Sequence, residues 1–269
     1  MGKLAAAALA LGWLVAAGAA QAVTWNGEFL QGGLVTGRTD PGGRVLLDGK
    51  PVRVGADGRF ILGFNRDAKA QVEIVLIDPQ GRRETLRQAI AARTYDIQRI
   101  NGMPPAQVTP PPDVLARIRK ESAEIAATRS RDTDQPWFAS GWIWPVHGVL
   151  SGIYGSQRIL NGEPREAHYG IDIAAPAGTP VLASTDGEVA LAEPDLYFNG
   201  GTVIIDHGYG LSAAYIHLQR LSVKTGQRVK QGEQIGTLGA TGRTTGPNLH
   251  WQVSWFDVHL DPQRLLPPQ

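Results

Sequence analysis

The sequence predicts a mainly β protein with two domains joined by a Pro-rich, partly helical linker. The chain has 269 residues, which is enough for one large domain or two modest ones. Its 33 glycines and 18 prolines suit short strands connected by many turns. Runs of β-type residues separated by turn signals occur in residues 23–95 and again in the C-terminal half, with a proline-rich stretch between them.

Residues 1–22 are predicted to be a secretory signal peptide. Lys3 supplies a positive charge, residues 4–19 are almost entirely apolar, and Ala20-Gln21-Ala22 matches a small-x-small cleavage pattern. A retained membrane anchor is the alternative, but the cleavage pattern directly after an Ala-rich run disfavours it. We therefore expect a periplasmic or secreted protein that begins at Val23, with no membrane span after cleavage.

Residues 23–95 are predicted to form a small β-sandwich of immunoglobulin type. Asp48-Gly49 is typical of a tight hairpin turn, and Asp57-Gly58 repeats that signal before the next apolar run. The strongest strand signal is Val72–Ile77. About seven strands at this spacing favour a sandwich. The segment carries no cluster of catalytic residue types, so we expect a spacer or a docking module for a protein partner.

Residues 96–135 are predicted to be a linker with a charged helix. Pro104-Pro105 and Pro110-Pro111-Pro112 favour an extended chain, and Asp113 is placed to cap a helix that ends near Ser130. Such a helix could bridge the domains or lie over one of them. The second domain is expected at residues 136–266.

Composition excludes some classes of function. A net charge of +1 gives no overall field that would draw the chain to nucleic acid. Because the chain has no cysteine, it has neither a disulfide framework nor a thiol for lipid attachment.

The most informative residues are His168, Gly170 and Asp172. The following segment, Ala175-Pro176-Ala177-Gly178-Thr179-Pro180, cannot sustain a helix, so a strand is predicted with residues 168, 170 and 172 on one face. Gly170 would leave that face open to a metal ion or a substrate. Ile171 and Ile173 would point into the core. Taken alone, a His and an Asp at this spacing are more often a surface pair than metal ligands.

A second segment provides the remaining ligand. Residues 249–255 alternate between apolar and polar, which places His250 on one face with Asn248 and Gln252. Two imidazoles and one carboxylate, with a fourth position left to water, are a usual ligand set for catalytic zinc, whereas structural zinc normally has four protein ligands. His217, near the end of another strand-like run, is suited to stabilise an oxyanion or to transfer a proton.

Residues of about 142–262 resemble the LytM/lysostaphin-type family of zinc-dependent peptidoglycan endopeptidases. The resemblance covers most of the second domain in order, and does not extend to residues 23–95. The matching stretches are His168-x-Gly-x-Asp172, Ala174-Ala175-Pro176-x-Gly178-Thr179-Pro180-Val181, Gly187-x-Val189, Gly200-Gly201-x-Val203-x-Ile205-x-His207-Gly208, Tyr215-Ile216-His217-Leu218, Val223-Lys224-x-Gly226-x-x-Val229-x-x-Gly232-x-x-Ile235-Gly236 and Gly239-x-Thr241-Gly242-x-x-Thr245-Gly246-Pro247-x-Leu249-His250.

The resemblance implies a compact, mostly antiparallel β domain of barrel-sandwich type with one zinc ion in a groove between loops. It implies that His168, Asp172 and His250 are the zinc ligands. His217 would be a catalytic histidine that orients the attacking water or stabilises the oxyanion. The implied substrate is a stem peptide or cross-bridge of peptidoglycan, hydrolysed by zinc-activated water.

Asn248 departs from the family pattern, which usually reads His-Leu-His where this chain reads Asn248-Leu249-His250. The first His of that pair has a catalytic or supporting role outside the ligand set. Asn cannot accept a proton at neutral pH, although its amide can donate a hydrogen bond to a carbonyl or an oxyanion. The change therefore threatens proton transfer more than charge stabilisation, and Asn248 is counted among the candidate catalytic residues.

Other polar residues have more ordinary interpretations. His207 is expected to be structural or a neighbour of the site, and His147 and His259 to be surface or packing residues. The loop at 155–167 would form one groove wall, where Arg158 and Arg165 could meet peptide carboxylates or simply face water. Tyr197 and Phe198 could line another wall or pack against their own hairpin.

The sequence leaves three alternatives to an active peptidase. A catalytically degenerate family member could bind or activate another cell-wall hydrolase, and Asn248 is the only support for it. A biotinyl or lipoyl carrier would need a Met-Lys hairpin, and the only methionines are Met1 and Met103. A non-catalytic wall-binding protein would use the N-terminal sandwich for binding.

Overall fold

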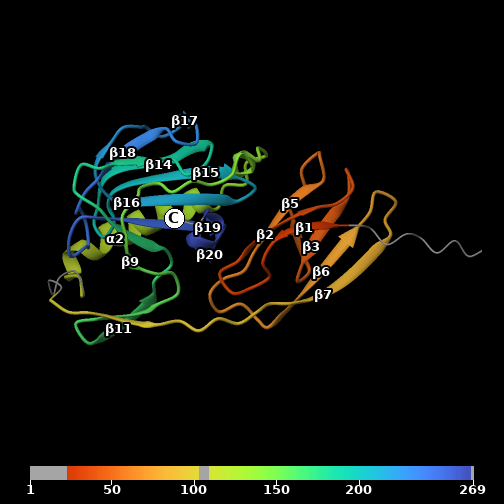
Figure 1. The fold of residues 1–269 in the computed structure, drawn as a ribbon, viewed down its shortest axis with the longest axis horizontal. Coiled ribbons are helices and arrows are strands. Elements are labelled where there is room, and N and C mark those ends of the chain that lie inside the picture. Colours follow the sequence, from red (N-terminus) through yellow and green to blue (C-terminus); the bar gives the residue numbers. More distant parts are fainter. Residues whose placement is uncertain (1–22, 103–108, 268–269) are drawn as a thin grey trace, which may run out of the picture.

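The structure is a computed structural model that describes residues 23–102 and 109–267. It confirms the mainly β class, with an N-terminal β region, a short helix and a C-terminal β domain (Figure 1). The predicted signal segment 1–22 and Pro104-Pro105 lie outside the described residues. Within the two described ranges, every helix is too short or too polar to span a lipid bilayer.

Two sheets build the N-terminal region. The first pairs three strands in the order β1-β2-β5, and the second pairs four in the order β4-β3-β6-β7. Buried side chains from both sheets share one core, including Phe60, Leu62 and Ile74. The hairpin predicted at Asp48-Gly49 joins β3 to β4, with positive φ at both residues. The strands are β1 (Thr24–Gly27), β2 (Leu34–Arg38), β3 (Arg44–Leu47), β4 (Lys50–Val52), β5 (Arg59–Gly63), β6 (Gln71–Ile77) and β7 (Arg83–Ala89).

The connecting segment contains a strand that the sequence did not indicate. β8 (Ile97–Ile100) pairs in parallel with β10 (Gln157–Leu160), which pairs antiparallel with β11 (Glu163–Ala167). In Figure 1 the chain runs from the N-terminal region along one side of the molecule to this small sheet. The segment predicted to be a linker therefore contributes a strand to the second domain.

The predicted linker helix is present as α2 (Leu115–Arg129), which follows the 3₁₀ turn η1 (Pro112–Val114). The prediction that Asp113 caps this helix is wrong, because Asp113 lies inside the 3₁₀ turn and no side chain bonds the first N–H groups of α2. Arg117 donates to the Asp195 carboxylate, and Glu121 accepts from the backbone N–H of Tyr197. The helix thus lies along β14 (Gly187–Leu196).

The C-terminal domain is built on one large antiparallel sheet with the path β17-β14-β15-β16-β19-β12-β9. β18 joins β13 to β16, and β20 pairs with β19. The strands are β9 (Val149–Gly152), β12 (Ile171–Ala174), β13 (Pro180–Leu182), β14 (Gly187–Leu196), β15 (Gly200–Gly208), β16 (Leu211–Leu221), β17 (Arg228–Val229), β18 (Gln234–Leu238), β19 (Asn248–Trp255) and β20 (Val258–Leu260), with 3₁₀ turns η2 (Trp137–Ser140) and η3 (Pro262–Leu265).

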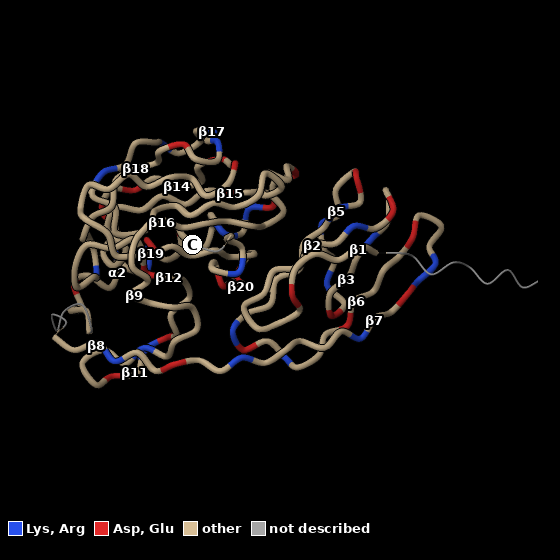
Figure 2. The backbone as a smooth tube through the Cα atoms, viewed as in Figure 1, with Lys and Arg blue, Asp and Glu red and all other residues tan. Residues whose placement is uncertain are grey.

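The two domains are packed against each other. Ile61 of β5 is buried in the core of the C-terminal domain. Arg93 forms an ion pair of 2.8 Å with the buried carboxylate of Asp261, and Arg66 Nε donates to the Gly155 carbonyl at 2.6 Å. Charged residues of both signs are interspersed along the two domains in Figure 2. The N-terminal domain is therefore held by apolar and polar contacts on one side of the second domain.

A buried histidine makes stability depend on pH. His207 of β15 is fully buried, its Nδ1 lies 2.7 Å from the Asp186 carbonyl, and burial lowers its pKa to about 4. In the unfolded chain that pKa returns to about 6.5, so unfolding takes up a proton between these values. Above about pH 6.5, His207 is neutral in both states and does not lower the free energy of unfolding. As the pH falls from there toward 4, the unfolded chain takes up the proton first and the free energy of unfolding decreases.

We expect the free energy of unfolding, measured with urea in the presence of a chelator, to fall between pH 7 and pH 5. His207→Gln should show a smaller fall over the same interval, because one of the histidines that take up a proton has been removed. An identical fall in both proteins would contradict this assignment.

Candidate metal centre

The positions of Asp172 and His250 follow from the pairing of β12 with β19. The two strands are antiparallel, and Asp172 lies directly opposite His250 in the register. Directly opposite residues project from the same face of a sheet, so the carboxylate and the imidazole converge. Ile171 and Ile173 point the other way and are fully buried, as the alternation predicts.

His168 reaches the same place from outside the strand. The strand predicted to include residue 168 begins only at Ile171, and the chain bends at Gly170. A Cβ atom at Gly170 would lie 2.6 Å from the Trp251 carbonyl oxygen, so the bend passes close against β19. Contacts to the backbone fix His168, because its backbone N–H donates to the Ser156 carbonyl and its Nδ1 lies 3.0 Å from the Ile153 carbonyl oxygen.

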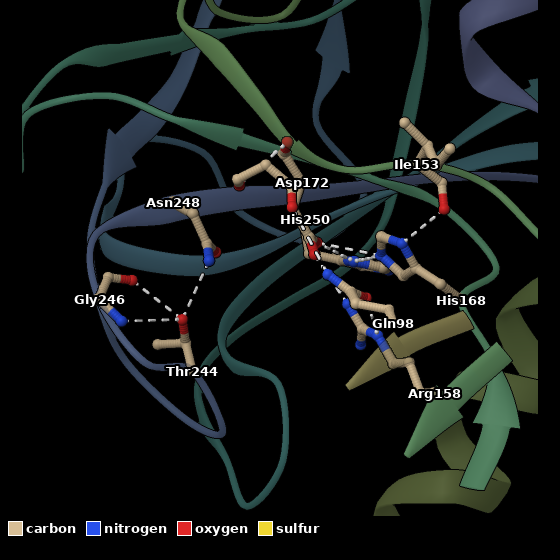
Figure 3. A network of polar contacts seen from close by, with 10 residues as sticks. Gln98, Ile153, Arg158, His168, Asp172, Thr244, Gly246, Asn248 and His250 are labelled. Atoms are coloured by element: carbon tan, nitrogen blue, oxygen red, sulfur yellow. Dashed lines mark hydrogen bonds and ion pairs between the residues drawn. The ribbon is translucent and has the colours of Figure 1, made fainter. Parts of the chain in front are cut away.

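Three ligand atoms meet between these residues. His168 Nε2 lies 3.1 Å from Asp172 Oδ1 and 3.0 Å from His250 Nδ1, and His250 Nδ1 lies 2.7 Å from Asp172 Oδ1. The carbonyl beside His168 Nδ1 requires the proton there, which leaves Nε2 with a lone pair directed at the other two atoms. Figure 3 shows this convergence together with the Ile153 contact.

The donor set fits a zinc ion. Tetrahedral ligands at 2.0–2.2 Å from zinc lie about 3.3–3.6 Å from one another. The three atoms here lie closer together, at 3.1, 3.0 and 2.7 Å, so a small outward shift of the side chains would admit the ion. Burial lowers the pKa of His250 to about 4, so its imidazole is neutral and has a lone pair to give. Burial alone would raise the pKa of Asp172, but the neighbouring imidazoles of His168 and His250 outweigh it and hold that pKa well below its usual range. His168, Asp172 and His250 could therefore hold a divalent cation.

His217 lies beside this cluster on β16. It adopts a positive φ of 67° at an irregularity in the pairing with β15, and its ring centre is 6.4 Å from that of His250. Such irregularities re-aim side chains, and strained backbone of this kind gathers at functional sites. Its Nδ1 lies 2.7 Å from the Thr241 carbonyl, and burial lowers its pKa. A neutral His217 that donates from Nδ1 keeps Nε2 as a proton acceptor.

Asn248 lies at the start of β19 on the same side as His250. Its Nδ2 donates to Thr244 Oγ1 at 3.0 Å, and that hydroxyl donates to the Gly246 carbonyl. Among the described residues, no group bonds its buried Oδ1. The sequence suggested the amide as a donor, whereas the atom left without a partner is an acceptor (Figure 3).

A groove runs past these residues. One wall comes from β8 and β10 and the other from the segment before β19, and no groove residue belongs to α2 in the described part of the chain. A larger hollow lies between the two domains, beside Trp25 and Trp142, away from the converging ligand atoms. The groove is lined by Gln98, Ile100, Ser151, Arg158, Leu160, Asp172, His217, Arg243, Thr244, Thr245 and Asn248.

The loop residues singled out from sequence have different surroundings. Arg158 turns into the site and donates to Asp172 Oδ2 at 2.7 Å, a contact that the sequence did not indicate. Arg165 lies on β11, the partner strand of β10, and donates to the carbonyl of its neighbour Pro164. Tyr197 and Phe198 pack edge to face against each other.

The remaining histidines lie away from the cluster of ligand atoms. His207 is buried against Trp142, and His147 is exposed. His259 stacks on Tyr169 with ring centres 4.5 Å apart. All three therefore have the packing or surface positions expected of them.

Comparisons of the sequence and of the structure with known proteins point to the same family. A model of peptidase family M23 matches residues 166–262. A solved structure of a Pseudomonas aeruginosa protein assigned to peptidase M23 is 31% identical, has a TM-score of 0.69 and covers 88% of this chain and 95% of the other. The similarity to that protein therefore extends beyond the C-terminal domain.

Two curated relatives are similar over the C-terminal part. The peptidoglycan DD-endopeptidase ShyC of Vibrio cholerae is 48% identical over 104 residues, which is 39% of this chain and 24% of ShyC. The murein hydrolase activator NlpD of Escherichia coli is 34% identical over 128 residues, which is 48% of this chain and 32% of NlpD. The chain thus matches a quarter to a third of the length of these relatives.

Proposed function

The chain belongs to peptidase family M23, and from that premise we propose that it is an exported zinc endopeptidase that hydrolyses peptide bonds in peptidoglycan. The observation that carries the proposal is the convergence of His168 Nε2, Asp172 Oδ1 and His250 Nδ1 beside a groove. The similarity to ShyC, which is named a peptidoglycan DD-endopeptidase, supports the substrate class.

Zinc held by these three residues would polarise the scissile carbonyl and lower the pKa of the attacking water. His217 would accept the proton of that water at Nε2, because its Nδ1 is committed to the Thr241 carbonyl. Asn248 would orient the peptide by accepting an N–H at Oδ1. The groove walls would hold the peptide so that carbonyl and water react at close range.

The cellular context is part of the proposal. Residues 1–22 would direct export and be removed after Ala22, which would place the protein in the periplasm or outside the cell. Residues 23–95 would serve as a spacer or as a docking module for a protein partner.

Turnover with known metal content tests this function. Purified full-length protein would be analysed for zinc and incubated with purified cell-wall peptides, and cleavage would be followed by liquid chromatography. We expect one zinc per chain and new peptide products. Stoichiometric zinc without any turnover would contradict the peptidase and favour a regulator.

A regulatory role is the second candidate, and Asn248 is the observation that favours it. NlpD, a murein hydrolase activator by name, is also similar to this chain. A protein that keeps the metal residues but lacks the usual histidine at position 248 could bind another cell-wall hydrolase without cleaving peptides itself.

Asn248→His is expected to raise the hydrolysis rate, because general acid–base groups contribute about 10²–10⁴-fold to such reactions. Asn248→Ala is the matched control and should not gain activity. Zinc content should stay the same in both variants, since Asn248 is outside the ligand set. An unchanged rate in Asn248→His would mean that the Asn248 amide already does what the histidine usual at this position does.

A further inference from the structure

Arg158 occupies an unusual place for an arginine on a surface hairpin. Its side chain is about three-quarters buried, with 24% of its surface exposed, and Nη2 lies 2.7 Å from Asp172 Oδ2. The other carboxylate oxygen, Oδ1, is the one that meets His168 and His250. The guanidinium therefore donates to Oδ2 and leaves Oδ1 to the converging ligand atoms.

Gln98 of β8 holds Arg158 in that position. The two residues are register neighbours in the parallel pair β8–β10, and Arg158 Nε donates to Gln98 Oε1 at 3.2 Å. The Gln98 amide also donates to the Ser151 carbonyl of β9, although that contact is long at 3.5 Å. Figure 3 shows Gln98, Arg158 and Asp172 in one chain of contacts.

The space around Asp172 leaves little freedom for the carboxylate. A Cβ atom at Gly152 would lie 2.4 Å from Asp172 Oδ2, so the β9 backbone approaches closely there. Arg158 contacts the carboxylate through Nη2 while its Nε bonds Gln98, and the rigid plane of the guanidinium fixes these two donors relative to each other. Hydrogen bonds to the outer atoms of a ligand typically change metal affinity by about 10- to 100-fold.

We propose that Arg158, held by Gln98 from the connecting strand β8, is a positioning residue that orients Asp172 Oδ1 for metal binding. The inference rests on the proposed metal function of the same site. It also gives the segment between the domains a role, because a strand outside the sequence-matched domain completes the surroundings of a ligand.

Arg158 has two opposing effects on zinc affinity. A positive charge near a divalent cation repels it, so charge alone predicts tighter zinc binding when Arg158 is removed. Orientation of the carboxylate predicts weaker binding. The sign of the change in zinc affinity therefore separates a positioning residue from a merely neighbouring charge.

The test is zinc affinity of the full-length protein, measured by competition with a chromophoric chelator. Arg158→Met is expected to bind zinc about 10- to 100-fold more weakly. Gln98→Ala should lose less, because Asp172 keeps its arginine, and Arg158→Lys should fall between Arg158→Met and the wild type. Arg99→Met is the matched control, since Arg99 is an exposed arginine beside Gln98 on β8 and should leave the affinity unchanged.

Circular dichroism and the melting temperature of the zinc-free proteins distinguish loss of folding from loss of positioning. If Arg158→Met does not fold, Gln98→Ala and Arg158→Lys decide the question. Unchanged or tighter zinc binding in the folded variants would overturn the proposal. Failure of the wild-type protein to bind zinc would instead overturn the proposed function.

Discussion

Asp172→Asn is expected to abolish zinc binding and peptide hydrolysis together. The substitution keeps the shape of the side chain and an oxygen that Arg158 can donate to, but it replaces the only anionic ligand by a neutral amide. Zinc contributes several kcal/mol to transition-state stabilisation, so the rate should fall by about 10³-fold or more. Zinc content by mass spectrometry and the turnover assay would both report the loss.

Asp195→Ala provides the control for this variant. Asp195 is an exposed carboxylate on β14 that pairs with Arg117 of α2, and β15 and β16 separate its strand from β19 in the sheet. It should retain one zinc per chain and the wild-type rate. Full zinc occupancy in Asp172→Asn at wild-type affinity would show that the ion is held elsewhere.

His217→Ala is expected to lower the turnover number by about 10²–10⁴-fold while zinc binding is retained. The reason is that His217 lies beside the ligand atoms without joining them, and its Nε2 is the acceptor left after Nδ1 bonds Thr241. Lower turnover with unchanged zinc content would distinguish His217 from the three ligands, whose loss should reduce both.

The pH profile adds a second measurement on His217. Burial lowers its pKa below the ordinary 6.5, so the neutral base persists into mildly acidic solution and the rate should fall only below that value. The acidic limb assigned to His217 should be absent in His217→Ala. His147→Ala, at an exposed histidine, should leave both rate and profile unchanged. A wild-type rate in His217→Ala would remove the residue from the mechanism.

Local signals in the sequence predicted much of the fold. The Asp48-Gly49 turn marks a hairpin, and the alternation around Asp172 and His250 indicates which side chains share a face of a strand. Both signals depend only on residues adjacent in the sequence, so they can be interpreted without knowing the fold. The family resemblance brought His168, Asp172, His217 and His250 together from distant positions. In the structure Asp172 and His217 line one groove, and His168 and His250 cluster with Asp172.

Features that depend on distant partners were not predictable. β8 lies in a segment taken as linker, and its pairing with β10 joins residues about sixty positions apart. The contact of Arg158 with Asp172 and the irregular backbone at His217 also depend on tertiary packing. The strand expected from residue 168 begins three residues later for a similar reason, because close approach to β19 bends the chain at Gly170.

Crystals of the zinc-loaded full-length protein, measured at X-ray energies on both sides of the zinc absorption edge, test the central claim most directly. We predict one anomalous peak per chain, within bonding distance of His168 Nε2, Asp172 Oδ1 and His250 Nδ1. An absent peak under saturating zinc, or a peak bound by other residues, would contradict the account.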